Sequence, residues 1–366
     1  MITATKTNLK YTLTALFLAV FAIFTASANP EESEKSEKFD AGKMIIEHIT
    51  DGHEWHILGE DKGIVAIPLP VIIYSDKGLD VFSSGKFEHG TASYVGKYNY
   101  KLNETGEVVV VNDAQQIDEA ATKKLWDFSI TKNVASLLLS AFLLLYVFLT
   151  VAATYKRNPN VAPKGMQSFV EPIILFIRDD VAKNSIGPKY LKFMPYLLTV
   201  FFFILFNNLL GMIPVFPGGA NLTGNIAVTM VLAVITFIIV TVNGNKHYWG
   251  HILAMPGVPK WVLIILTPIE IFGVFLRPSV LMIRLFANML AGHIIPLALF
   301  ALIFIFAAMN IGLGMGVSVL SVAFAVFMGL LELLVAFIQA YVFTLLSAIY
   351  FGAAVEEAHS HDESIV

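Results

Sequence analysis

The dominant pattern along the chain is a series of apolar runs separated by short polar segments. The runs at about 134–153, 193–213 and 225–242 each have the length that one helix needs to cross a membrane, roughly 17–25 residues. Two further runs, 261–308 and 317–354, are about twice as long as one span requires. The pattern predicts an all-α polytopic membrane protein.

The two long runs fit two arrangements. Each run holds either two spans or one strongly tilted helix, in which case the pair forms a C-terminal hairpin through residues 310–316. At a rise of about 1.5 Å per residue, wholly helical runs would be roughly 72 and 57 Å long, about twice the hydrocarbon thickness. The tilted hairpin gives about five membrane crossings in all.

The N-terminal residues 1–28 have the pattern of a secretory signal peptide. Two lysines precede an apolar run at 11–24, and small residues follow at 26–28. We expect cleavage after Ala28, with an uncleaved anchor as the alternative. In both cases the segment 29–128 is expected to be exported.

The exported segment has the mixed composition of a small water-exposed domain. Residues 64–74 are rich in Ile and Val, and the runs 97–102 and 108–111 flank the turn sequence Asn-Glu-Thr-Gly at 103–106. This pattern predicts some β structure, including a hairpin.

Basic residues set the expected orientation of the spans. Lys156, Arg157 and Lys164 follow the first span, and such clusters mark the cytoplasmic side. The N-terminal domain is then periplasmic and the C-terminus cytoplasmic, in a bacterial inner membrane. Between residues 166 and 185, apolar and charged positions alternate as in an amphipathic helix on the cytoplasmic face.

Composition agrees with a membrane protein and removes other classes. Of 366 residues, 56% are hydrophobic and 14% charged, and the net charge of −4 comes without a basic cluster, so no nucleic-acid partner is expected. The absence of cysteine excludes disulfides and thiolate metal sites. Three histidines at 48, 53 and 56 lie close together, but exposed histidines without cysteine seldom bind a metal, and we expect no metal and no cofactor. No phosphate-binding Gly-x-x-x-x-Gly-Lys loop occurs.

An arginine inside the first long run is the strongest functional signal. A guanidinium group stays protonated in proteins, and placing one at the centre of a membrane costs roughly 2.5–3.5 kcal/mol. Arg284 lies in the middle of the run 261–308 with no other charged residue within a turn on either side, which argues against simple snorkelling to a headgroup. Glu270 and Arg277 precede it at intervals of seven and Asn288 follows at i+4, which predicts one polar stripe unless Pro278 breaks it.

Three motifs resemble one family. The segment Arg-Leu-Phe-Ala-Asn-Met-Leu-Ala-Gly-His at 284–293 resembles the signature of subunit a of F-type ATP synthases, the stationary half of a proton-driven motor. Glu332 with Gln-Ala-Tyr-Val-Phe at 339–343 resembles the family's last helix, and Asn-Asn-Leu-Leu-Gly-Met-Ile-Pro at 207–214 an earlier helix end. The similarity covers roughly residues 165–357, so the exported extension lies outside the minimal family pattern.

The resemblance implies a non-catalytic, proton-transporting subunit of ATP synthesis and favours the tilted hairpin. Its implied partners are the c-ring, the peripheral-stalk b subunits, other ATP synthase subunits and membrane lipid. Two half-channels would deliver protons to and from ring carboxylates, with protons rather than sodium as the expected ion. The residues expected to take part in proton translocation are Arg284, His293, Glu332, Gln339, Asn288, Glu270, Arg277, Asn208 and Asn225.

Helical spacing also predicts that His293 and Glu332 form a pair. Arg284 to His293 covers about 13.5 Å and Glu332 to Gln339 about 10.5 Å at helical rise. If the helices are antiparallel and Gln339 lies beside Arg284, Glu332 falls near His293.

Two other classes remain as alternatives. A secondary ion or solute transporter usually shows paired repeats with matching broken helices, and the two halves show no such correspondence. A structural scaffold would explain the hydrophobicity, but it would not explain why Arg284, His293 and Glu332 lie deep inside apolar runs.

Overall fold

The computed structural model describes most of the chain after residue 40. Two compact units are distinguished, Met1–Asp40 and Ala41–Val366, and the described residues belong to the second. The predicted signal peptide and its cleavage site lie outside the described residues, as does the segment after residue 356. The described ranges are 41–58, 65–88, 90, 92–103, 105–157, 161–213, 218–255 and 258–356.

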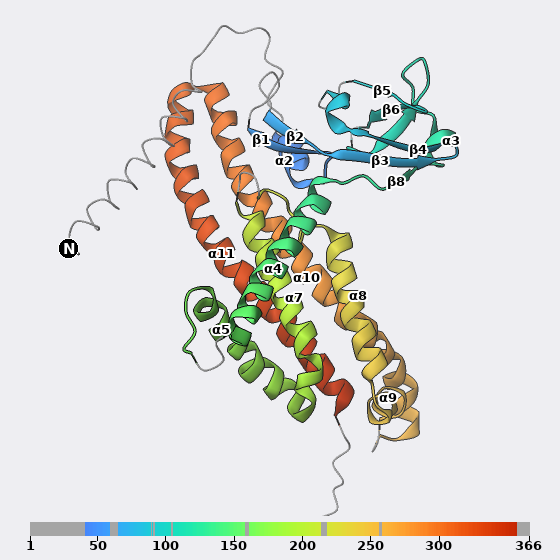
Figure 1. Ribbon diagram of the computed structural model, residues 1–366, viewed down its shortest axis with the longest axis vertical. Helices are drawn as coiled ribbons and strands as arrows, with labels where there is room; N and C mark the ends of the chain where they lie inside the picture. Colours follow the sequence, from blue (N-terminus) through green and yellow to red (C-terminus); the bar gives the residue numbers. More distant parts are fainter. Residues whose placement is uncertain are drawn as a thin grey trace, which may run out of the picture. The chain divides into compact units, whose positions relative to one another are not determined.

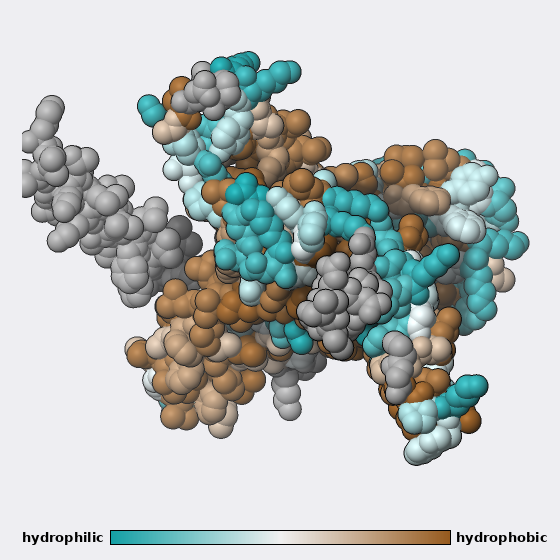
Figure 2. Space-filling view, turned by 90° about the horizontal axis from the view of Figure 1, so that it is seen from below, coloured by the Kyte–Doolittle hydropathy of each residue, from teal (hydrophilic) through white to brown (hydrophobic). Residues whose placement is uncertain are grey.

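Five helical segments of the described part are long and apolar enough to cross a membrane, which confirms the predicted fold class. The first is α4, Lys132–Arg157, and the third is α8, Ile226–Asn243, followed by the short α9, Lys246–Leu253. The last two, α10 (Lys260–Met309) and α11 (Ile311–Val355), form the long C-terminal hairpin (Figure 1). Figure 2 shows large brown hydrophobic areas on the surface of the molecule seen from below.

The second span is longer than the predicted 193–213 because helix continues almost unbroken from residue 166. The amphipathic segment expected at 166–185 is therefore helical, but it leads directly into the span. Its parts are α5 (Met166–Phe176), a π-helical stretch (Ile177–Lys183), α6 (Asn184–Ile186), a 3-10 turn (Gly187–Lys189) and α7 (Tyr190–Gly211).

Helices α7, α10 and α11 share one core. Phe201 of α7, Leu285 of α10 and Phe343 of α11 are 0–1% exposed, and the rings of Phe193 and Phe351 stack with centroids 4.8 Å apart. Because lipid tails are as apolar as these side chains, close packing rather than removal from water holds such helices together. This packing fixes the register of the hairpin.

The turn of the hairpin is shorter than the predicted 310–316, and that boundary was wrong. Asn310 alone separates the helices, and its side-chain oxygen accepts a hydrogen bond from Gly312 N at 2.8 Å, which caps α11. A Cβ atom on Gly314 would lie 2.7 Å from the Ala307 Cα. The glycines that suggested a loop therefore allow the two helices to approach closely.

Helix α10 remains helical through Pro268, Pro278 and Pro296. Pro278 therefore does not break the predicted polar stripe, which lies on one continuous helix. Arg277 Nη2 lies 3.9 Å from Glu270 Oε2, as the spacing of seven predicts.

The N-terminal region contains small antiparallel sheets, as predicted. Strand order is β1-β2 in one sheet, β4-β3-β8 in a second and β5-β6-β7 in a third. The predicted hairpin is formed by β6 and β7, whereas the expected strand at 64–74 is divided between β2 and β3 of different sheets. The elements are α2 (Ala41–Ile49), β1 (Glu54–Leu58), β2 (Val65–Pro68), β3 (Pro70–Ser75), β4 (Gly78–Ser83), a 3-10 turn (Ser84–Phe87), β5 (Tyr94–Val95), β6 (Asn99–Leu102), β7 (Val108–Val111), α3 (Glu119–Thr122) and β8 (Trp126–Asp127).

The second and third sheets enclose a small core of their own. Val71, Ile73, Phe87 and Tyr100 are fully buried in it. The Tyr100 hydroxyl donates to Asp80 Oδ2 at 2.8 Å, so the one polar atom of this buried ring has a partner.

Several hydrogen bonds join this domain to the helices. Trp55 Nε1 donates to Gly218 O at 2.9 Å, and Trp55 is 4% exposed. At the start of α4, Lys132 N donates to Gly52 O at 2.8 Å and Asn133 N to Asp51 Oδ1 at 3.0 Å. The domain is therefore tied to the first span and to the segment that follows α7.

We predict that Trp55→Phe loosens residues 218–225. A smaller aromatic ring is retained but the indole donor is lost, and the loss of the hydrogen bond should cost about 1 kcal/mol, or about fivefold in local opening. Amide hydrogen exchange of the full chain in nanodiscs measures this. Trp261→Phe, at a position 73% exposed, is the control. Unchanged exchange in residues 218–225 of Trp55→Phe would show that the contact does not hold the segment.

Candidate functional site

Arg284 lies near the middle of α10 with its side chain exposed. Leu281 and Leu285, on either side of it in sequence, are 1% and 0% exposed and belong to the helix core. Asn288, one turn further on, is exposed as well. Arg284 and Asn288 thus share a strip of α10 that the described helices leave uncovered.

A side-chain hydrogen bond joins the two helices of the hairpin at this level. Asn288 Nδ2 donates to Gln339 Oε1 at 2.9 Å, and Gln339 is only 3% exposed. The sequence resemblance predicts that Gln339 lies close to Arg284. In the structure its side chain accepts a hydrogen bond from Asn288, one turn beyond Arg284. The bond holds Asn288 beside Arg284 and fixes the register of α10 on α11.

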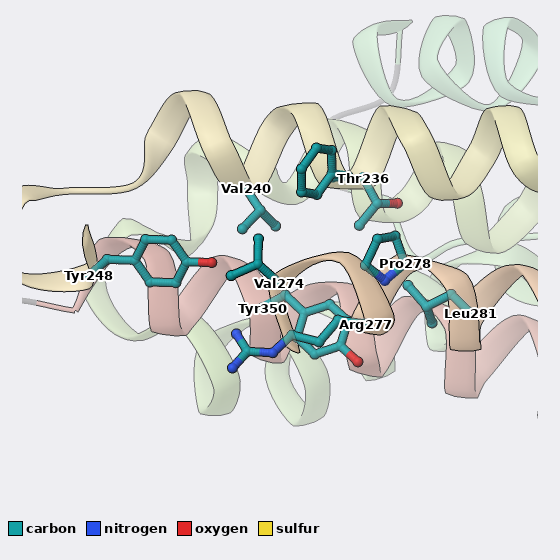
Figure 3. Close-up of a pocket in the computed structure, with 9 residues that line it drawn as sticks. Thr236, Val240, Tyr248, Val274, Arg277, Pro278, Leu281 and Tyr350 are labelled. Carbon is teal, nitrogen blue, oxygen red and sulfur yellow. The ribbon is translucent and has the colours of Figure 1, made fainter. Parts of the chain in front are cut away.

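The polar stripe continues toward the start of α10. The Arg277 guanidinium carbon lies 5.9 Å from the centre of the Tyr350 ring, and Arg277 Nη2 lies 3.9 Å from Glu270 Oε2. Figure 3 shows Arg277 and Tyr350 together at a small pocket between α8, α9, α10 and α11. The pocket is lined by Thr236, Phe237, Val240, Tyr248, Val274, Arg277, Pro278, Leu281 and Tyr350.

Two titratable side chains lie at the other end of the motif, each against a glycine. A Cβ atom on Gly292 would be 2.9 Å from Glu332 Oε1, and one on Gly211 would be 3.4 Å from His293 Nε2. Glu332 therefore packs against the residue directly before His293, while the imidazole is turned toward α7. Both side chains are half-buried. A direct interaction between them stays a prediction.

Asn208 links three elements close to Glu332. Its Oδ1 atom accepts from Thr223 Oγ1 at 2.7 Å, and its Nδ2 atom donates to Ala336 O at 3.3 Å, one turn after Glu332. Asn208 is fully buried and Thr223 is 1% exposed. Sequence reasoning missed Thr223, although the uncharged polar segment before α8 was a usable signal.

Other amides of this region have different roles. Asn225, an expected site residue, is the N-cap of α8, where its Oδ1 atom accepts from Ala227 N at 2.9 Å. This contact gives Asn225 a structural role, and its part in proton transfer stays a prediction. Sequence reasoning also missed Asn207 and Asn221, which are 2% and 6% exposed.

In this region three buried polar atoms, Asn207 Oδ1, Asn221 Nδ2 and Glu332 Oε1, have no hydrogen-bond partner among the described residues. Buried polar atoms are nearly always paired with protein or with water. These atoms therefore favour water in the region between α7, the segment before α8, and α11.

Of the three histidines close in sequence, His53 is buried. Its Nε2 atom lies 4.0 Å from Asp127 Oδ2, and burial lowers the pKa of its imidazole despite the neighbouring Asp127, Asp51 and Glu54. The side chains of His48 and His56 lie outside the described part of the structure. The absence of a metal site stays an expectation.

Comparison with known families gives two matches along the chain. The model of the ATP synthase A chain family matches residues 134–352, which include all the expected site residues. A second model, described as a domain of unknown function (DUF8433), matches residues 44–128, the region of small sheets. The two matched ranges do not overlap, so the N-terminal extension corresponds to the second family model.

Relatives named ATP synthase subunit a support the first match. A protein of Chlorobaculum tepidum, ATP synthase subunit a 2, is 48% identical over 243 residues, which cover 65% of this chain and 66% of the relative. Those of Chloroherpeton thalassium and Myxococcus xanthus are 45% and 42% identical, each over 65% of this chain and over 72% and 76% of their own lengths. With its family match extending over more than half of its length, the chain belongs to the ATP synthase A chain family.

Proposed function

We propose that this chain is the stationary proton-channel subunit of an ATP synthase membrane sector. The exposed side chain of Arg284 in the middle of α10 carries the proposal. A fixed charge facing hydrocarbon would cost roughly 2.5–3.5 kcal/mol or more, so a polar partner is expected to cover it. A rotating ring of small subunits, each with one membrane carboxylate, supplies such a partner.

One half-path would end at Glu332 and His293. Asn207 Oδ1, Asn221 Nδ2 and Glu332 Oε1 are buried polar atoms that water can satisfy. Their presence supports an aqueous route from the end of α7 toward the carboxylate. Histidine and glutamate both exchange protons near neutral pH when their surroundings favour it, so they suit the last step before the ring.

The second half-path would run along the beginning of α10. Glu270 and Arg277, which lie 3.9 Å apart, make that end of the helix polar. Arg284 stands between this pair and Glu332 on the same hairpin. The two paths are therefore offset along the helix, and a proton can pass between them only on a ring carboxylate.

Arg284 would then separate the paths by charge. An ionised ring carboxylate is attracted to the guanidinium in a low-dielectric site, while the same cation repels a proton that would cross directly. The electrical part of the driving force is about 2.3 kcal/mol per charge for each 100 mV. Nucleotide chemistry belongs to other subunits, and this chain is non-catalytic.

The proposed setting includes the expected partners and orientation. The partners are the c-ring, the peripheral-stalk b subunits and membrane lipid. The signal peptide ends at Ala28, the domain at 29–128 is exported, and the chain after α11 is cytoplasmic.

We predict that the mature protein begins at Asn29. Signal peptidases cut after small residues that follow an apolar run, and this pattern occurs at 26–28. Intact-mass spectrometry of the purified subunit measures the N-terminus, and a reporter fused near Gly90 measures the side of the membrane. An intact Met1, or a reporter active only in the cytoplasm, contradicts the prediction.

We predict that Arg284→Ala abolishes coupled proton transport and that Arg284→Lys also fails. Alanine removes the charge, and a buried lysine ammonium can lose its proton and lacks the planar donor set of arginine. ATP-driven proton pumping in inverted vesicles, together with ATP synthesis, measures the loss. Arg157→Ala, exposed at the end of α4, is the matched control and should pump normally. Normal pumping by either Arg284 variant refutes the proposed role.

We predict that His293→Leu or Glu332→Leu alone strongly reduces proton flux, and that His293→Glu combined with Glu332→His restores much of it. The reason is that the carboxylate lies beside Gly292, so the two side chains can exchange places on facing helices. Flux is measured in reconstituted complexes after equal assembly has been verified.

The double exchange decides between a pair and two independent residues. If the exchanged variant conducts no better than the worse single variant, His293 and Glu332 do not act together. The half-path would then have to be assigned to other residues, while the role of Arg284 would be unaffected.

A further inference from the structure

Exposed apolar side chains cover one face of the β4-β3-β8 sheet. Tyr74 of β3 is paired directly with Leu79 of β4 and with Trp126 of β8. Directly opposed residues of paired strands point to the same side of a sheet. These three side chains, 54%, 54% and 66% exposed, therefore form one continuous row.

A second row lies beside the first. Ile72 is paired with Val81, and Phe128 N donates to Ile72 O at 2.9 Å. Val81 and Phe128 are 60% and 62% exposed. We call Tyr74, Leu79, Val81, Trp126 and Phe128 the outer sheet face.

The other side of the same sheet is the domain core, where Val71 and Ile73 are 0% exposed. Antiparallel sheets that face water normally carry polar residues on the open side. The open side of this sheet is apolar instead, and a contiguous exposed apolar patch of this kind usually marks a contact surface.

The position of the outer sheet face relative to α4 indicates what it contacts. Only three residues separate Phe128 from Lys132, the first residue of α4, which limits their distance to roughly 13 Å. The connection is held in place, since Ile130 N donates to Pro70 O at 3.0 Å and Lys132 N to Gly52 O at 2.8 Å.

Helix α4 has 26 residues, which gives a length of about 39 Å against a hydrocarbon core of about 30 Å. The excess of about 9 Å leaves room for its first turn, which begins with Lys132 and Asn133, in the headgroup layer. The exposed Leu138, Phe142 and Leu145 further along α4 form a lipid-facing surface. The β5-β6-β7 sheet shares the core on the inner side of β3, so the outer sheet face is the open side of the domain.

Composition and size favour lipid over a protein partner. Trp and Tyr, which have an apolar ring and a polar tip, are enriched where acyl chains meet headgroups. Lys124 lines the same shallow depression as Tyr74 and Trp126 and lies 3.6 Å from Asp76, placing an ammonium group within reach of lipid phosphates. A stable protein interface takes roughly 20–30 residues a side, far more than this face offers.

We propose that the outer sheet face rests on the membrane leaflet at which α4 begins, with its aromatic rings at the boundary of headgroups and acyl chains. The domain would then be anchored twice, by its hydrogen bonds to α4 and by direct contact with lipid. This contact does not depend on the route that protons take.

The chain contains no cysteine, so a single introduced cysteine carries a single environment-sensitive fluorophore. The test compares Val81→Cys and Leu79→Cys with Val95→Cys in the complete complex, assembled with cysteine-free partner subunits in liposomes. Val95, in β5 of the β5-β6-β7 sheet, is 72% exposed and serves as the matched control. Quenchers are phosphatidylcholine with a nitroxide at the headgroup or at the end of the acyl chain, and iodide in the water.

We expect headgroup nitroxide to remove most of the fluorescence at positions 79 and 81, acyl-end nitroxide to remove little, and iodide to remove little. Position 95 should show the reverse, with strong quenching by iodide and weak quenching by nitroxide lipid. Strong quenching of positions 79 and 81 by iodide would mean that the face is solvated, and protection from every quencher would mean that protein covers it. Either result overturns the proposal.

Discussion

The arrangement of the membrane part depends on one constraint, a cation that cannot be neutralised inside an apolar helix. Arg284 is exposed on α10, while Leu281 and Leu285 beside it are packed into the core. The helix must therefore present one side to its own bundle and another to a partner that tolerates charge. The hairpin with α11 and the hydrogen bond from Asn288 to Gln339 hold the guanidinium at a defined position along the hairpin. The roles proposed for the other polar residues depend on that position.

Glycine makes room for the titratable groups near it. Glu332 fits against Gly292 and His293 against Gly211, so three helices approach closely here, and a Cβ atom on Gly292 would displace the Glu332 carboxyl group. The loop before α8 completes this region through Thr223 and Asn208. Trp55 adds a contact from the N-terminal domain to the same loop, which connects the extension physically to the region where proton entry is proposed.

The spans and the main site motif were predictable because both rest on strong, local signals. These signals are the uninterrupted length of the apolar runs and the charged Arg284 inside one of them. The turn at Asn310 was not predictable, since glycines such as Gly312 and Gly314 occur both in loops and where two helices pack closely. Thr223 and Trp55 were missed because their partners are distant in sequence and neither residue type is unusual in its segment. The apolar sheet face required strand register, which alternation in short strands does not specify.

The central claim is that two aqueous half-paths are kept apart at Arg284. Ordered water in an electron cryo-microscopy map of the assembled complex tests it most directly. We expect two separate columns of water, one reaching Glu332 and His293 and the other reaching the Glu270 and Arg277 end of α10, with Arg284 facing a ring carboxylate between them. A single continuous column past Arg284, or an Arg284 side chain turned away from the ring, would contradict the account.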